Sequence, residues 1–203
     1  MIKITHISDT HGFHNKVYLS GGDILVHSGD IFDYNNLIPN EEIIEWINNS
    51  PYEYKLIVPG NHDKNLSTIS LPEKVIVLDN KTTELFGIKF YGVSACLIEK
   101  NSKNTFTQTT DNEIKNQLLD FCPDILITHG PPKGIFDNKN GGSIGSVSLL
   151  NYVIEKKPKY HFFGHAHHWK GVHSNGDTIF CNSSVTYNVR QGIVTGNSLD
   201  IFY

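Results

Sequence analysis

The side chains of this sequence that could do chemistry are carboxylates, an amide and imidazoles, and they recur in short motifs. Mixed oxygen and nitrogen ligands suit Mn, Fe or Zn, whereas Mg and Ca sites are built from oxygen. Each motif comes at or near the end of an apolar segment, and together they hold enough ligands for two adjacent cations. In chain order the motifs are Asp9-Thr10-His11, Gly29-Asp30, Gly60-Asn61-His62-Asp63, Thr128-His129-Gly130 and Gly164-His165-Ala166-His167.

Two of the motifs place possible ligands two residues apart. Asp9 and His11 follow the first apolar segment, and His165 and His167 follow the segment that ends at Phe163. Residues i and i+2 of an extended chain point to the same side, so each pair can converge on one cation. Either pair alone would also fit an ordinary turn, and the prediction of a metal centre therefore depends on the whole set.

Asp30, Asn61 and His129 also follow short apolar segments. The glycine before Asp30 lets the backbone approach closely, so a carboxylate there could bridge two cations, although an Asx-turn would equally explain an isolated aspartate. Ligands of open α/β sheets collect at the carboxyl ends of the strands. We therefore expect the motif residues to meet at one end of a sheet.

The segments that must position these residues alternate between strand and helix patterns over much of the chain. Short β-branched apolar runs predict strands, and apolar residues at helical spacing predict helices. Near the C-terminus the pattern changes to short strands, with Asn175-Gly176 typical of a hairpin turn. The predicted strands are 2–7, 24–27, 55–58, 75–78, 88–93, 125–128, 161–163, 169–174, 178–181, 192–195 and 199–203, and the predicted helices are 41–49, 111–121 and 146–156.

We expect one domain over residues 1–203, because a second domain would be cramped in a chain of this length. Alternating strands and helices predict an α/β protein, here a four-layer α/β/β/α sandwich of two mixed sheets flanked by helices. Two long polar segments, 100–110 and 131–145, lie next to motif residues. We expect parts of both to contact substrate, although a variable surface loop explains 100–110 equally well.

Composition and charge exclude several classes of protein. The 17 Lys and Arg residues against 21 Asp and Glu give a net charge of −4, without the basic stripe that an extended nucleic acid needs. No segment approaches the roughly 20 apolar residues of a membrane span. The chain reaches Asp9 too soon after Met1 for a removable leader. These features predict a soluble cytoplasmic protein that binds neither membranes nor extended nucleic acid.

The remaining cysteines and histidines predict structure rather than chemistry. Cys96, Cys122 and Cys181 are too far apart for a Cys-x-x-Cys pair and have apolar neighbours, so we expect buried structural thiols. Among the histidines outside the motifs, His14 is the candidate for supporting a ligand, because it lies near the first motif. The others are expected to pack in the core or lie on the surface: His6, His27, His161, His168 and His173.

The ordered motifs resemble those of the calcineurin-like metallophosphoesterase superfamily, from residue 5 to about residue 186. Within that superfamily, segments 127–134 and 161–167 are similar to the small metallophosphodiesterase-domain family of bacteria and animals, and segment 181–184 extends the likeness. The resemblance implies that Asp30 bridges two metal ions. The other implied ligands are Asp9, His11 and His167 for the first ion, and Asn61, His129 and His165 for the second.

The resemblance implies a metal-dependent phosphoric ester hydrolase with two divalent ions, Mn²⁺ favoured and Fe or Zn as alternatives. The ions lower the pKa of water, so a metal-bound hydroxide would attack phosphorus in line. His62 would stay off the metals and stabilise developing charge or protonate the leaving alkoxide. Asp63 would orient His62, although a turn carboxylate fits its position equally well. Every motif position matches the family pattern, so we expect substantial activity.

The expected substrate follows from the narrower likeness alone. We expect a small phosphodiester, such as a cyclic or linear nucleotide. The same metal chemistry would serve other phosphoesters, which leaves a phosphomonoesterase or a protein Ser/Thr phosphatase as alternatives. A metal-stabilised interaction scaffold is the non-enzymatic alternative. A scaffold would not need an imidazole such as His62 beside the paired ions, and this residue therefore favours an enzyme.

Overall fold

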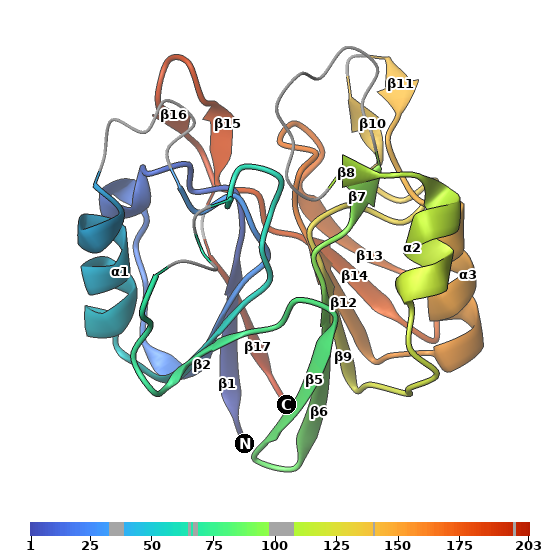
Figure 1. The fold of residues 1–203 in the computed structure, drawn as a ribbon, viewed down its shortest axis with the longest axis horizontal. Coiled ribbons are helices and arrows are strands. Elements are labelled where there is room, and N and C mark those ends of the chain that lie inside the picture. The colour runs from blue at the N-terminus through green and yellow to red at the C-terminus, as the bar shows by residue number, and fades with distance from the viewer. Residues whose placement is uncertain (33–38, 65, 67–68, 98–107, 140, 197) are drawn as a thin grey trace.

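Two mixed β-sheets stack face to face, with helices on the outer side of each (Figure 1). The computed structural model describes residues 1–32, 39–64, 66, 69–97, 108–139, 141–196 and 198–203. α1 covers one sheet, while α2 and α3 cover the other. The predicted four-layer α/β/β/α sandwich is therefore confirmed.

The first sheet has the strand order β17-β1-β2-β3-β4. Strands β1 to β4 run parallel to one another, and β17 pairs with β1 in the antiparallel direction. Because parallel strands share a direction, the residues that follow β1, β2 and β3 emerge at the same edge of the sheet. The strands are β1 (Lys3–Ile7), β2 (Gly22–His27), β3 (Tyr52–Ile57), β4 (Val75–Val77) and β17 (Leu199–Phe202).

The second sheet has the strand order β13-β14-β12-β9-β6-β5. The four inner strands are parallel, and the edge strands β13 and β5 are antiparallel to their neighbours. This arrangement again brings the carboxyl ends of the inner strands to one edge. The strands are β5 (Lys81–Leu85), β6 (Ile88–Val93), β9 (Ile125–Thr128), β12 (Tyr160–Phe163), β13 (Gly171–Ser174) and β14 (Ile179–Asn182).

The main hydrophobic core lies between the two sheets. Ile4, Ile24 and Leu56 of the first sheet pack with Phe90 and Phe162 of the second, and all of them are fully buried. Burial of one such side chain contributes about 1.5–3 kcal/mol. This shared core fixes the sheets against each other, so the strand ends of both come together at one end of the molecule.

The helices cover the outer faces with their apolar sides. Ile43 and Ile47 of α1 (Asn40–Asn49) pack against the first sheet. α2 (Asp111–Gln117) and α3 (Val147–Lys156) pack against the second sheet. No helix in the described ranges is long and apolar enough to cross a membrane.

Short elements lie at the end of the molecule opposite the two chain termini (Figure 1). The predicted loop 131–145 contains a pair of two-residue strands. Most of the other predicted loop, 100–110, lies within residues 98–107, which fall outside the described ranges. The substrate contacts expected of both segments stay predictions. The short elements are η1 (His14–Lys16), β7 (Cys96–Leu97) paired with β8 (Gln108–Thr109), β10 (Asn138–Lys139) paired with β11 (Gly142–Ser143), and β15 (Thr186–Asn188) paired with β16 (Ile193–Val194).

The differences between predicted and observed elements have local causes. β5 was not predicted, because it is a polar, mostly exposed edge strand without an apolar pattern. The second helix ends at Gln117 instead of 121, since Leu118 is extended and the Leu119 N–H donates to Tyr91 Oη over 3.1 Å. The Asn175-Gly176 hairpin joins β13 to β14 as predicted.

Candidate metal centre

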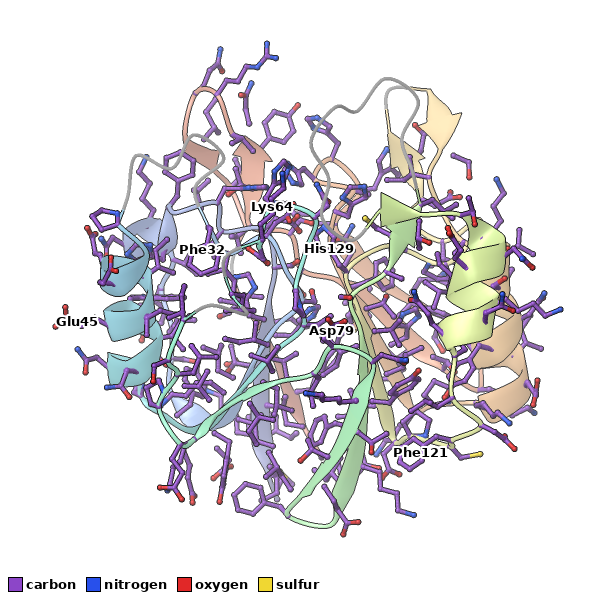
Figure 2. All side chains as sticks on the ribbon, viewed as in Figure 1. Phe32, Glu45, Lys64, Asp79, Phe121 and His129 are labelled. Atoms are coloured by element: carbon purple, nitrogen blue, oxygen red, sulfur yellow. The ribbon has the colours of Figure 1, made fainter. Side chains whose placement is uncertain are left out.

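The predicted ligands lie where the carboxyl ends of strands from both sheets meet. Asp9, Asp30 and Asn61 follow β1, β2 and β3 of the first sheet, while His129 and His165 follow β9 and β12 of the second. Figure 2 shows His129 near the centre of the molecule, between the two sheets. Its Nδ1 lies 2.9 Å from the carbonyl oxygen of Ser28, which directly connects the two sheets at this point.

The first group of ligands consists of Asp9, His11 and His167. Their ligand atoms lie within 4.8 Å of one another. His167 Nε2 is 3.2 Å from Asp9 Oδ1 and 3.3 Å from His11 Nε2. A carboxylate and two imidazoles at this spacing can share one transition-metal ion.

The second group contains Asn61, His129 and His165. His129 Nε2 is 3.0 Å from Asn61 Oδ1, and the rings of His129 and His165 meet edge to face with centroids 4.9 Å apart. The amide oxygen and the two imidazoles form a second mixed ligand set. The structure thus brings together the residues that the family resemblance assigned to a second ion.

Asp30 lies between the two groups. Its Oδ2 is 3.7 Å from His11 Nε2 of the first group and 3.4 Å from His129 Nε2 of the second. The side chain is almost fully buried. A carboxylate oxygen at this position could be shared by two cations, and the bridging role expected of Asp30 stays a prediction.

Several of these residues have a strained backbone. The φ angles of Asp9, His11, Asp30 and His165 are 57°, 46°, 56° and 65°, which places them in the left-handed region. This conformation costs about 1–2 kcal/mol for a residue with a Cβ. Such outliers persist where surrounding contacts over-determine them, and they cluster at functional sites.

Asp63 holds the loops that carry Asp30 and Asn61. Its Oδ2 accepts the N–H groups of Asp30 and Gly60 over 2.7 and 2.8 Å. Its Oδ1 accepts the N–H groups of Ile31 and Phe32, the next two residues of the Asp30 loop, over 2.8 and 3.1 Å. The carboxylate therefore faces backbone, and its expected role in orienting His62 stays a prediction.

Asp9 is positioned from the second sheet. Its Oδ2 accepts the Ser184 hydroxyl over 2.7 Å and the His165 N–H over 2.9 Å. Gly164 permits this approach, because a Cβ at that position would collide with the side chains of Ser8 and Asp9. Ser184 lies in a segment that the family resemblance included, but nothing in its local sequence indicated a contact with Asp9.

The hydrogen bond between His129 and Ser28 fixes which nitrogen of the imidazole keeps a proton when a metal binds. A carbonyl oxygen only accepts, so Nδ1 carries the proton and Nε2 is the nitrogen available to a metal. Nε2 is also the atom that faces Asn61 and Asp30. The orientation of His129 is thus set for ligation through Nε2.

The charges of the site compensate one another inside the protein. Burial alone would raise the pKa of Asp9 and Asp30, but imidazoles hold both below the usual range, chiefly His167 for Asp9 and His129 for Asp30. Burial alone would lower the pKa of His129, but the carboxylates of Asp30 and Asp9 raise it to about 9. Two ionised carboxylates held away from water favour a bound cation. The donor set therefore fits divalent metal ions.

Buried histidines outside the motifs support the motif loops. His27 Nε2 lies 3.0 Å from Thr10 Oγ1, and His27 Nδ1 accepts the Gly29 N–H over 3.2 Å. His161 Nε2 lies 2.9 Å from Thr128 Oγ1. Burial lowers the pKa of both histidines to about 3, so they pack as neutral rings. They are structural as expected, but their contacts with motif residues could not be read from sequence spacing.

His62 lies next to the first group. Its backbone N–H donates to Asp30 Oδ1 over 2.9 Å, and its ring centroid is 5.5 Å from that of His11. The residue is only partly buried, unlike His11. It therefore presents an imidazole at the accessible side of the paired groups.

The other candidates have mixed outcomes. His14 packs beside Trp46, with Nε2 3.6 Å from Glu42 Oε1, which places it against α1. Cys181 is buried in the core as predicted. Cys122 is exposed, so the prediction that it is buried is wrong: it lies in the largely exposed connection between α2 and β9.

Comparisons with known proteins agree with this geometry. The family model described as Calcineurin-like phosphoesterase matches residues 2–169. UPF0046 protein K07C11.7 of Caenorhabditis elegans is 32% identical, over 90% of this chain and 69% of its own length. Human Metallophosphoesterase domain-containing protein 1 is 30% identical, over 88% of this chain and 64% of its own length. The chain therefore spans less than two thirds of the human relative.

Two solved structures share the fold. TT1561 of Thermus thermophilus has a TM-score of 0.62 at 13% identity, covering 97% of this chain and 98% of its own. Phosphopantetheinyl Hydrolase (PptH) from Mycobacterium tuberculosis has a TM-score of 0.61 at 14% identity, covering 91% and 89%. Family match and sequence identity together show that this chain belongs to the calcineurin-like phosphoesterases, a family of metal-dependent phosphoester hydrolases.

Proposed function

We propose that this protein is a dinuclear metallophosphodiesterase that acts on a small substrate. The position of Asp30 carries the proposal, because one carboxylate oxygen faces His11 of one ligand group and His129 of the other. Ions about 3.5–4 Å apart, joined by a shared ligand, are the usual arrangement for in-line phosphoryl displacement. Two divalent ions in this site would supply Lewis-acid stabilisation and water activated near neutral pH.

His62 is the proposed catalytic side chain. Its ring lies beside His11, and its backbone is tied to Asp30, so the imidazole is held at the paired groups without belonging to either. Imidazole has a suitable pKa for proton transfer near neutral pH. His62 would donate a hydrogen bond or a proton to the oxygen that leaves phosphorus.

The proposed metal is Mn²⁺, with Fe or Zn as alternatives. The support is the mixed ligand set of carboxylate, amide oxygen and imidazole described above. The first group and Asp30 supply oxygen and nitrogen alone, which suits Mn²⁺.

The proposed substrate is a small phosphodiester, such as a cyclic or linear nucleotide. The preference for a diester rests on the resemblance of segments 127–134 and 161–167 to the small metallophosphodiesterase-domain family. A net charge of −4 argues against a long polyanion as the substrate. The proposed location is the cytoplasm, because the spacing of the three cysteines is not that of a disulfide framework.

A direct comparison of substrates tests the proposal. The purified protein loaded with Mn²⁺ would be assayed on an aryl phosphodiester and on its monoester, and then on a panel of cyclic and linear nucleotides. We expect faster turnover of the diester and of at least one nucleotide. A clear preference for the monoester would instead support a phosphomonoesterase, and absence of hydrolysis by the metal-loaded protein would support a scaffold.

A further inference from the structure

A buried thiol lies among the ligands of the second group. Cys96 begins β7, just beyond the carboxyl end of β6, the strand that pairs in parallel with β9. Its Sγ and the ligand nitrogens of His129 and His165 lie within 4.8 Å of one another. Its Sγ is also 3.7 Å from Asn61 Oδ1. Cys96 therefore faces each of the residues expected to hold the second ion.

The position of Cys96 is fixed by the loop that carries His129. The Gly130 N–H donates to the carbonyl oxygen of Ala95 over 3.3 Å. A Cβ on Gly130 would lie only 2.9 Å from Cys96 Cβ, closer than such atoms approach. The absence of a side chain at Gly130 thus lets the thiol approach the ligand group, and Cys96 is 1% exposed.

The distance from Cys96 Sγ to Asn61 Oδ1 fits two ligands of one ion. Metal–sulfur and metal–oxygen bonds of about 2.3 and 2.1 Å at a tetrahedral angle place sulfur and oxygen about 3.6 Å apart. A thiol is also a weak donor and could form a weak hydrogen bond with the amide oxygen. The imidazoles of His129 and His165 beside the sulfur favour ligation, because imidazole and thiolate together form a typical transition-metal site.

We propose that Cys96 is a further protein ligand of the second metal ion and binds it as a thiolate. The inference rests on the dinuclear centre of the proposed function. The thiol proton would be released to solvent when the ion binds, as for other cysteine ligands. The sulfur makes the second position softer than the first. Mn²⁺ at saturating concentration would fill both positions, but the second would prefer Zn or Fe when these ions compete with it.

Cobalt substitution tests this ligand without relying on catalysis. Metal-free protein would be loaded with Co²⁺, and its absorption would be recorded in the visible and near-ultraviolet regions. Thiolate bound to Co²⁺ gives an intense charge-transfer band in the near ultraviolet, whereas oxygen and nitrogen ligands give only visible d–d bands. We expect the charge-transfer band in the wild-type protein and its loss in Cys96→Ser, with d–d bands retained.

A matched variant keeps the test independent of the folding of Cys96→Ser. The sequence has 3 cysteines, so the double variant Cys122→Ser/Cys181→Ser retains Cys96 alone. We expect it to keep the charge-transfer band at full intensity. Loss of the band in this variant, or its persistence in Cys96→Ser, would assign it to another thiol and overturn the proposal.

The same spectra separate this inference from the proposed function. If wild-type protein binds two equivalents of Co²⁺ with d–d bands but no charge-transfer band, the thiolate ligand is wrong and the dinuclear centre stands. If it binds no Co²⁺ at the motif residues, both the ligand and the dinuclear centre are wrong. A charge-transfer band without phosphodiester hydrolysis would support the ligand while contradicting the function.

Discussion

At the scale of single residues, the site depends on charged groups that are kept away from water. Asp9 and Asp30 are buried carboxylates whose pKa values imidazoles hold low. Both also have positive φ angles, so conformational strain adds to the cost of burying charge. Divalent cations would offset both costs when bound. The arrangement is better explained by metal binding than by stability of the fold.

His62→Ala tests the division between metal binding and catalysis. The imidazole contributes to proton transfer or charge stabilisation, so we expect kcat to fall by about 10²–10⁴-fold. Metal content should stay unchanged, because His62 belongs to neither ligand group. Both quantities are measured on the same Mn²⁺-loaded samples, by turnover and by elemental analysis.

His173→Ala is the matched control, because this histidine is exposed on the edge strand β13. It should keep wild-type turnover and metal content. Wild-type activity in His62→Ala would remove the catalytic role of that residue.

Asp63→Asn tests whether the loops around Asp30 depend on one buried carboxylate. An amide keeps a single acceptor oxygen, so its NH₂ group would face backbone donors that Asp63 now satisfies. Loss of charge-assisted hydrogen bonds of this kind costs about 1.5–3 kcal/mol each. We expect a lower free energy of unfolding in urea together with weaker metal binding. Unchanged stability and metal affinity would show that the conformation of the Asp30 loop does not depend on hydrogen bonds to the Asp63 carboxylate.

At the scale of elements, the helices over the second sheet are joined at their N-termini. Asp111 begins α2, and its carboxylate accepts the hydroxyls of Ser146 and Ser148 over 2.5 and 2.7 Å. Ser146 is also the N-cap of α3, where its oxygen accepts the Leu149 N–H. This contact fixes the start of α3 against α2 on the outer face of the second sheet.

Asp111→Asn tests the contribution of the hydrogen bonds from Ser146 and Ser148 to stability, which should depend on pH. Burial would raise the pKa of Asp111, but hydrogen bonds from Ser146 and Ser148 lower it below its usual value. A lowered folded-state pKa adds stability that is present above the unfolded-state pKa of about 3.9 and is lost as the pH falls through the folded value. We expect the free energy of unfolding of the wild type to exceed that of the variant by roughly 1–2 kcal/mol at pH 7.

Urea unfolding at a series of pH values measures this difference. It should shrink when the pH falls below about 4, because Asp111 becomes protonated. The control is Asp177→Asn, an exposed aspartate in the β13–β14 turn. A difference that stays constant over the whole pH range would show that the carboxylate charge is not responsible.

The elements could be predicted where burial leaves a pattern in the sequence. β1, β6, β9 and β12 have apolar runs, because they are buried among the parallel strands of the two mixed sheets. β5 leaves no such pattern, since it lies at an edge. The end of α2 depends on a hydrogen bond to a tyrosine 28 residues earlier, which no local signal contains.

The site residues, too, could be predicted only where the local sequence carries a signal. The i, i+2 pairs and the strand ends pointed to side chains that the fold does bring together, because their types and positions repeat a pattern. The contacts of Ser184 with Asp9 and of Cys96 with Asn61 join residues 175 and 35 positions apart. Both residues have ordinary local surroundings, so only the packing of the two sheets shows that they reach the site.

At the scale of the whole molecule, the candidate metal centre contains residues from both sheets. Asp9, Asp30 and Asn61 come from the first sheet, and His129 and His165 from the second. The shared core lies below them and would hold the sheets together without metal. Bound ions would add cross-links at the end of the sheets where several of these residues are strained.

Removal of metal should therefore lower the thermal stability. Ligands that bind only the folded state stabilise it by about 2.7 kcal/mol at a concentration 100 times the Kd. We expect EDTA to lower the Tm of the Mn²⁺-loaded wild type and added Mn²⁺ to restore it. Asp30→Ala should show a Tm that responds to neither treatment. An unchanged Tm in the wild type would show that bound metal does not stabilise the folded protein.

Anomalous diffraction from crystals of the protein grown with Mn²⁺ would locate the ions themselves. We expect two anomalous peaks about 3.5–4 Å apart, with the carboxylate of Asp30 between them. One peak should be bound by Asp9, His11 and His167, and the other by Asn61, His129 and His165. A single peak, or manganese bound away from these side chains, would contradict a paired-ion centre.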